Sequence, residues 1–178
     1  MKTTAIALAL SIFALPVLAA NPEVGGAAMF ENKNIVENAV NSADHTTLVA
    51  AVKAAGLVDA LMGAGPFTVF APVNTAFAAL PAGTVDTLLM PENKDMLSKV
   101  LTAHVVAGDY KIADLRAMVG ADGFANLKTL SGDALSVKFS GNQMRIYSES
   151  RNIGTITIAD VDQSNGVIHV IDAVMVPK

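Results

Sequence analysis

The sequence predicts an α+β fold, in which a mostly helical first half precedes a strand-rich second half. Up to Val119, apolar residues recur at spacings of one, three and four, the periodicity of amphipathic helices, with a strand-like interruption at residues 67–70. From Phe124 onward, apolar and polar residues alternate between short turn sequences, as in half-buried strands. Since helices and strands are segregated rather than interleaved, we expect antiparallel strands with several helices packed beside them.

The expected helices each have a local start or stop signal or an apolar face. Residues 92–103 give the clearest pattern, because Pro91 suits the start of a helix and one apolar stripe follows, made of Met96, Leu97, Val100 and Leu101. A helix is expected over residues 46–55, where Gly56 would end it and Asp44, Thr46 and Thr47 are candidate N-caps. Asn74 or Thr75 can cap a helix through Leu80. The other helices are expected over residues 34–41, 57–62, 84–90 and 112–119.

The expected strands are bounded by turn residues. Phe67–Phe70 forms a short strand that ends at Ala71-Pro72. The later strands are expected over residues 126–130, 135–139, 144–148, 153–161 and 167–176. Asn165-Gly166 separates the last two, and Asn-Gly is the strongest two-residue signal for a hairpin.

The chain divides into a leader, a lead-in and one domain. Residues 1–20 have a basic start, an apolar run, Pro16 and small residues at Ala19-Ala20, which is the layout of a secretory signal peptide. The apolar run of 16 residues is shorter than the roughly 20 that a spanning helix needs, so we expect cleavage and export to the periplasm or beyond, with no membrane anchor left. Residues 21–33 are predicted to be a flexible lead-in, and residues 34–178 a single domain.

Composition excludes several classes of function. The 178 residues include no cysteine, which removes thiol catalysis, disulfide scaffolds and cysteine-ligated metals. With a net charge of −4 and only 16% charged residues, the chain lacks the positive charge needed to grip a phosphate backbone, so no nucleic-acid partner is expected.

The polar residues form no recognisable catalytic or metal-binding pattern. The three histidines, His45, His104 and His169, lack the close spacing of metal-binding pairs, and we interpret the latter two as hydrogen-bonded structural residues. His104 ends a predicted helix, where a positive charge would be favoured. The run from Asp160 resembles a calcium loop, but Asn165 and Ile171 occupy the positions that need glycine and a carboxylate. We therefore expect no catalytic residue, cofactor-binding residue or metal ligand, and no enzyme.

Three stretches, in order, resemble the signatures of the fasciclin domain family. The stretches are Gly65–Phe77 (GPFTVFAPVNTAF), Leu101–Gly108 (LTAHVVAG) and Asn165–Pro177 (NGVIHVIDAVMVP). The first is similar to the opening signature, a strand that runs through Ala-Pro into a helix. The second is similar to the central Tyr-His segment, with Ala103 in place of the tyrosine, and the third to the closing signature.

The resemblance covers residues 34–178 and implies a wedge of antiparallel strands with packed helices. It also implies a secreted, single-domain bacterial protein that acts in cell-surface or matrix adhesion, with a surface or matrix protein or polysaccharide as partner. In animal relatives the Tyr-His segment and an Asp-Ile pair are implicated in integrin-mediated adhesion. The matching positions here, which the resemblance implies as interaction residues, are Asp160, Val161, Asp162 and His104. The signature stretches are expected to share one core, made of Val69, Phe70, Phe77, Ile168, Val170 and Ile171.

Two other functions stay open at this stage. One is binding of a small molecule or polysaccharide, which a concave apolar pocket with converging polar groups would favour. The other is an enzyme that uses Asp160, His169 or His104 in a cleft, which a histidine with a carboxylate partner would favour.

Overall fold

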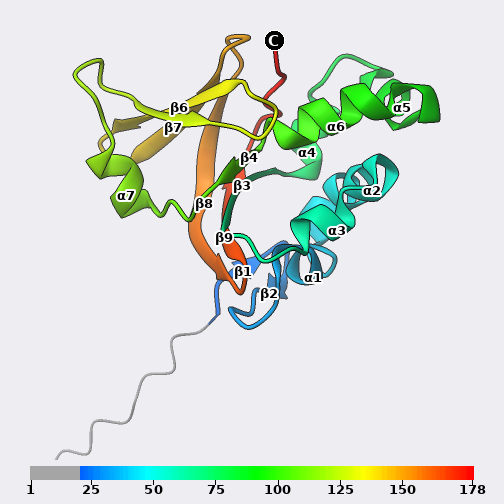
Figure 1. Ribbon diagram of the computed structural model, residues 1–178, viewed down its shortest axis with the longest axis horizontal. Coiled ribbons are helices and arrows are strands. Elements are labelled where there is room, and N and C mark those ends of the chain that lie inside the picture. The colour runs from blue at the N-terminus through cyan, green and yellow to red at the C-terminus, as the bar shows by residue number, and fades with distance from the viewer. Residues whose placement is uncertain (1–20) are drawn as a thin grey trace, which may run out of the picture.

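A computed structural model describes residues 21–178 as a twisted sheet with most of its helices on one side and one short helix, α7, on the other (Figure 1). The predicted signal peptide, residues 1–20, lies outside the described residues. The helices are α1 (Ile35–Ala39), α2 (Thr46–Ala55), α3 (Val58–Leu61), α4 (Asn74–Ala78), α5 (Thr84–Leu89), α6 (Lys94–Thr102) and α7 (Ile112–Ala117). Within residues 21–178, no helix is long and apolar enough to cross a membrane.

The main sheet has seven strands, and one neighbouring pair of them is parallel. The strands are β3 (Phe67–Pro72), β4 (Val105–Ala107), β5 (Ala125–Lys128), β6 (Ala134–Ser140), β7 (Gln143–Ser148), β8 (Ile153–Gln163) and β9 (Gly166–Ile171). Their order is β4-β3-β9-β8-β7-β6-β5. The predicted α+β class is confirmed, and all neighbours pair antiparallel except β3 and β9.

Local signals place most helix boundaries correctly. The side chain of Asn34 accepts a hydrogen bond from Glu37 N while the Glu37 carboxylate accepts one from Asn34 N, which fixes the start of α1. Helix α2 ends where Gly56 adopts φ 71°, a left-handed conformation that glycine reaches without steric cost. Met96 departs from the prediction: its side chain is 60% exposed, so the apolar stripe of α6 consists of the other three residues.

The cap of α2 comes from a residue far along the chain. The predicted caps Asp44, Thr46 and Thr47 do not fill this role; the side-chain oxygen of Asn74 accepts hydrogen bonds from Thr47 N at 3.0 Å and from the Thr46 hydroxyl at 3.2 Å. Asn74 therefore does not cap its own helix, whose N-cap is Val73. The prediction failed here because the two helix starts meet only in the folded chain.

The β8–β9 hairpin turns at Ser164-Asn165, one residue before the predicted Asn165-Gly166. Gln163 pairs with Gly166, so Gly166 is already the first residue of β9. Its φ of 150° and the closeness of the Phe67 carbonyl leave no room for a Cβ at this position. Strand β9 also ends at Ile171 rather than Val176, and β4 forms where no strand was predicted.

The core is divided by the sheet into two clusters rather than one. Val69, Ile168 and Val170 face the layer of α1–α6, while the alternating residues Phe70 and Ile171 face the sheet half formed by β5–β7. Strand β8, 11 residues long, links the two halves and carries two irregularities in its pairing with β9, which bend it (Figure 1). A bridge between Val106 and Thr129 joins β4 to the end of β5, so the two edges of the sheet meet around the second cluster.

The lead-in is packed rather than flexible, which corrects the prediction for residues 21–33. Strands β1 (Glu23–Val24) and β2 (Ala27–Ala28) form a small hairpin. Val24 and Met29 are buried against the helical cluster, and Ser164 N donates a hydrogen bond to Lys33 O at 2.9 Å. The apolar residues Val24 and Met29, within the short segment 21–33, are the sequence feature that indicates this packing.

Candidate functional site

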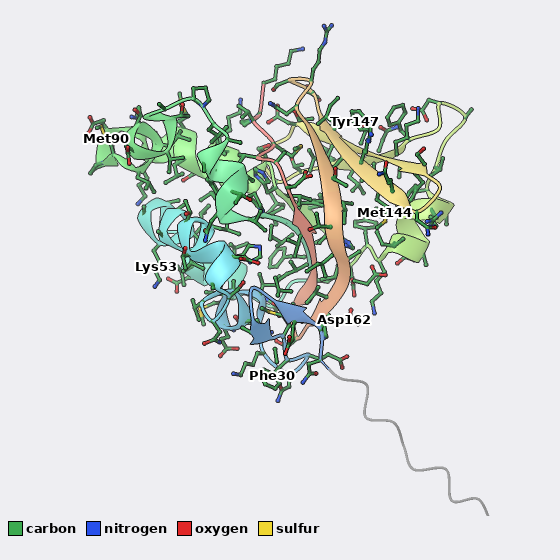
Figure 2. All side chains as sticks on the ribbon, turned by 180° about the vertical axis from the view of Figure 1, so that it is seen from behind. Phe30, Lys53, Met90, Met144, Tyr147 and Asp162 are labelled. Atoms are coloured by element: carbon green, nitrogen blue, oxygen red, sulfur yellow. The ribbon has the colours of Figure 1, made fainter. Side chains whose placement is uncertain are left out.

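Two of the four predicted interaction residues reach the surface. Asp160 is exposed and Asp162 half-buried, both on the outer part of β8 near its turn, where Figure 2 shows Asp162. Val161 has an exposed fraction of 0% and His104 of 3%, so both lie in the interior. Only the two carboxylates can therefore meet a partner without rearrangement of the fold.

Asp162 is paired within the chain. Its carboxylate lies 2.9 Å from the ammonium of Lys111, and both side chains remain substantially exposed to solvent. The hydrogen bond and charge of Asp162 raise the pKa of Lys111, and the charges of Asp109 and Asp160 add to this effect. We call Asp109, Asp160 and Asp162, grouped around Lys111, the acidic patch.

Asp160 has a structural task as well as a surface position. It adopts φ 55°, and its carboxylate accepts a hydrogen bond from Ile112 N at 2.8 Å, which satisfies a free backbone donor at the start of α7. Its own N–H donates to His169 Nδ1 at 3.2 Å. Asp160 therefore holds α7 against β8, and its charge is partly engaged before any partner arrives.

His169 is a structural residue in this arrangement. Its Nε2 donates to the Tyr110 carbonyl at 2.8 Å while Nδ1 accepts from Asp160, and its ring stacks on Phe70 with centroids 5.4 Å apart. Burial lowers the pKa of His169, which favours the neutral ring that this pair of hydrogen bonds requires. The expected structural role of His169 fits these contacts.

His104 joins the end of α6 to the C-terminal segment. Its Nδ1 donates to the Val100 carbonyl at 2.8 Å, and Met175 N donates to its Nε2 at 2.8 Å. Complete burial lowers the pKa of His104 to about 4, so the ring is neutral at physiological pH. The expectation that a positive charge would be favoured here is wrong, because desolvation outweighs the helix dipole.

Neither His104 nor His169 is arranged for catalysis, and the described residues contain no cluster of metal ligands. Across residues 21–178, no three His, Asp or Glu residues are placed to share a metal ion. The hydrogen bonds of His104 and His169 go to backbone atoms, so neither has a carboxylate partner of the kind that a general base needs.

An apolar cavity lies in the helical half, and no sequence pattern predicts it. It has a volume of about 130 Å³ and lies between α1, α2 and α3 on one side and β3 and β4 on the other. Of its 19 lining residues, 16 are Ala, Val, Leu, Ile or Phe. The polar members are Lys53, Thr102 and His104. Sequence patterns predict which helix faces are apolar, whereas the space left between them depends on how the elements pack.

Comparison with known sequences identifies a family for most of the chain. The family model of the Fasciclin domain matches residues 43–177. Protein sll1483 of Synechocystis sp. is 50% identical over 154 residues, which cover 86% of this chain and 79% of that protein. Immunogenic protein MPB70 of Mycobacterium bovis is 35% identical over 144 residues, which cover 78% of this chain and 66% of that protein.

Two further similarities extend to animal proteins. The transforming growth factor-beta-induced protein ig-h3 of Sus scrofa is 37% identical over 130 residues, 73% of this chain but only 17% of that longer protein. A solved FAS1 domain pair from the insect cell adhesion molecule Fasciclin I superposes with a TM-score of 0.70 at 19% identity, covering 79% of this chain and 50% of the other. At that identity the superposition supports the fold alone.

Proposed function

Because this chain belongs to the fasciclin domain family, we propose that it is an exported, non-catalytic adhesion protein whose acidic patch contacts a cell-surface or matrix component. The observation that carries the proposal is the family membership. The partner proposed is a surface or matrix protein or polysaccharide that presents basic groups.

The acidic patch supports this choice of surface by its charge and position. Asp109 and Asp160 are exposed, and Asp162 is half-exposed, so the three carboxylates outnumber the single ammonium of Lys111. A basic partner can compete with Lys111 for Asp162, since an exposed ion pair of this kind contributes only about 0–1 kcal/mol. The contacts of Asp160 with Ile112 N and of Asp162 with Lys111 hold both carboxylates in place, which reduces the ordering cost of binding.

Export is the second part of the proposal. Its basis is the leader pattern of residues 1–20, which lie outside the described structure, and the name of a further relative, the cell surface glycolipoprotein MPB83 of Mycobacterium bovis. We expect cleavage to leave Ala20 or Asn21 at the mature N-terminus. N-terminal sequencing of the exported protein tests this, and intact Met1 in that fraction would contradict it.

Adhesion can be tested with beads coated with the exported protein. The test variant is Asp160→Asn with Asp162→Asn, because asparagine removes the charge while its side-chain oxygen can still accept the hydrogen bond from Ile112 N. Bead binding to bacterial cells, and to purified matrix proteins and polysaccharides, should fall for this variant and should depend on salt in the wild type.

The matched control is Asp59→Asn with Asp86→Asn. These two exposed carboxylates lie in α3 and α5, so the control changes the net charge equally while it leaves the acidic patch intact. Equal binding by the patch variant and the wild type, at equal melting temperature, would remove the acidic patch from the interface. Absence of wild-type binding to every surface would reject adhesion itself.

A further inference from the structure

We propose that the apolar cavity of the helical half binds a single acyl chain that carries a carboxylate, with the chain inside the cavity and the carboxylate at Lys53. This inference goes beyond adhesion, because it assigns a small-ligand site that is lined by residues of α1, α2 and α3 and shares no residue with the acidic patch. Figure 2 shows Lys53 on α2, well separated from Asp162.

The volume of the cavity fits a short piece of hydrocarbon. Protein interiors are packed with few voids larger than a water molecule, so about 130 Å³ between well-formed elements is unusual. An apolar cavity of about 150 Å³ stays dry and accepts benzene. By that measure this cavity holds about six carbon atoms of a chain.

Two of the three polar lining residues already have hydrogen-bond partners within the protein and need none from a ligand. The Thr102 hydroxyl donates to the Ser98 carbonyl at 2.7 Å, within its own helix. Both ring nitrogens of His104 are hydrogen-bonded to backbone atoms. With these groups satisfied, the interior of the cavity offers only hydrocarbon contacts, which favours an apolar chain over a sugar or another polar molecule.

Lys53 supplies the remaining polar group and selects the charge of the ligand. It is the only charged residue among those that line the cavity, it is exposed, and it makes no ion pair within residues 21–178. A carboxylate at the end of an apolar chain would complement it. Lysine can also lay its own methylene stem along the chain while the ammonium stays in water.

The rim provides a route into the cavity. Leu130 lines the cavity with an exposed fraction of 49%, and Leu57 and Val58 line it while half-buried. Partly exposed apolar side chains at the edge of a cavity give a chain a continuous apolar path from solvent. The ligand can therefore enter past Leu57, Val58 and Leu130.

The first experiment titrates decanoate into protein recovered from the exported fraction of cells expressing the full chain. Methyl resonances of Val36 and Leu57, which line the cavity, should shift in a saturable way, whereas those of Met118 and Val119 in the other half should not. The melting temperature should rise with decanoate concentration. Absence of saturable shifts at the cavity methyls, below the concentration at which decanoate aggregates, would overturn the proposal.

The second experiment tests the charge. Decanoate should bind about two- to fivefold more tightly than decan-1-ol, as for an exposed ion pair, and decyltrimethylammonium should bind least. Lys53→Gln should abolish the preference for decanoate over decan-1-ol, and the control Lys128→Gln, on β5, should retain it. A preference that survives Lys53→Gln would refute the assignment of Lys53.

The third experiment fills the cavity. Ala39 lines it from α1, and Ala39→Leu places three additional carbons at its wall while leucine keeps a high helix propensity. Decanoate affinity should fall at least tenfold with the fold retained by circular dichroism. Unchanged affinity in a folded Ala39→Leu variant would contradict the proposal; if the variant does not fold, the methyl shifts of the wild type decide.

Discussion

Acidification from pH 7 to pH 5 should destabilise the protein, and His104 should account for about 2 kcal/mol of the loss. Burial lowers the pKa of His104 from 6.5 to about 4, so between these values the unfolded chain binds a proton that the folded chain excludes. Stability is therefore unaffected by His104 above pH 7 and is lost as the pH falls through 6.5. The difference between the two pKa values corresponds to about 3.4 kcal/mol, of which about 2 kcal/mol is reached at pH 5.

Urea denaturation at pH 7 and pH 5 measures this loss, and a variant isolates the contribution of His104. His104→Gln does not titrate, and its side-chain oxygen can accept the hydrogen bond from Met175 N, although the bond to the Val100 carbonyl is lost. The variant should be less stable than wild type at pH 7 but should lose about 2 kcal/mol less on going to pH 5.

Two results would refute this reasoning. One is an equal loss of stability in wild type and His104→Gln between the two pH values, since His104 would then contribute nothing to the pH dependence. The other is a ring-carbon NMR titration of His104 with a midpoint near 6.5 in the folded protein. His45 and His169 also have pKa values lowered chiefly by burial, so the total loss in wild type should exceed that from His104.

The other predictions concern packing, capping, surface position and metals. Phe77 is buried in the helical cluster, so Phe77→Ala should cost about 3–5 kcal/mol in chemical denaturation, and a loss below about 1 kcal/mol would show that it packs poorly. Asn74→Ala should cost about 1 kcal/mol because α2 loses its cap, while the exposed neighbour Thr75→Ala should cost less. Met96→Gln should change stability by no more than about 0.5 kcal/mol, in contrast to about 2–5 kcal/mol for Leu97→Ala; comparable losses would contradict the exposure of Met96. Chelator should leave the melting temperature unchanged, since no described group is placed to hold a metal, and a clear decrease would reveal a metal site.

Local physical signals were sufficient for much of the fold. Gly56 alone predicted the end of α2 at Ala55, because glycine adopts the left-handed conformation that ends a helix at little steric cost. Strands β6 and β7 fell within about a residue of their predicted bounds, since alternation over six residues and an intervening glycine turn are contained in the segment itself. The three signature stretches were enough to predict the family that the comparisons identify.

Packing between distant segments decided what local signals could not. Residues 105–107 became strand β4 because β3 is beside them, and the parallel pairing of β3 with β9 joins two strands that are separated in sequence by five other strands of the same sheet. Met96 belongs to the apolar stripe predicted on α6 but is exposed in the structure. The spacing of apolar residues predicts which face of a helix is apolar, but the neighbouring elements decide how much of that face is buried.

The candidate sites depend on contacts between distant segments even more than the fold does. The sequence placed two carboxylates near a hairpin, but the pairing of Asp160 with Ile112 spans 48 residues and the bond from Met175 to His104 spans 71. Whether a charge is free or engaged, and whether a histidine is solvated or desolvated, depends on such partners. The cavity beside Lys53 depends on them most, because its volume is the space that α1, α2 and α3 leave when they pack on β3 and β4, and no single segment of the chain contains it.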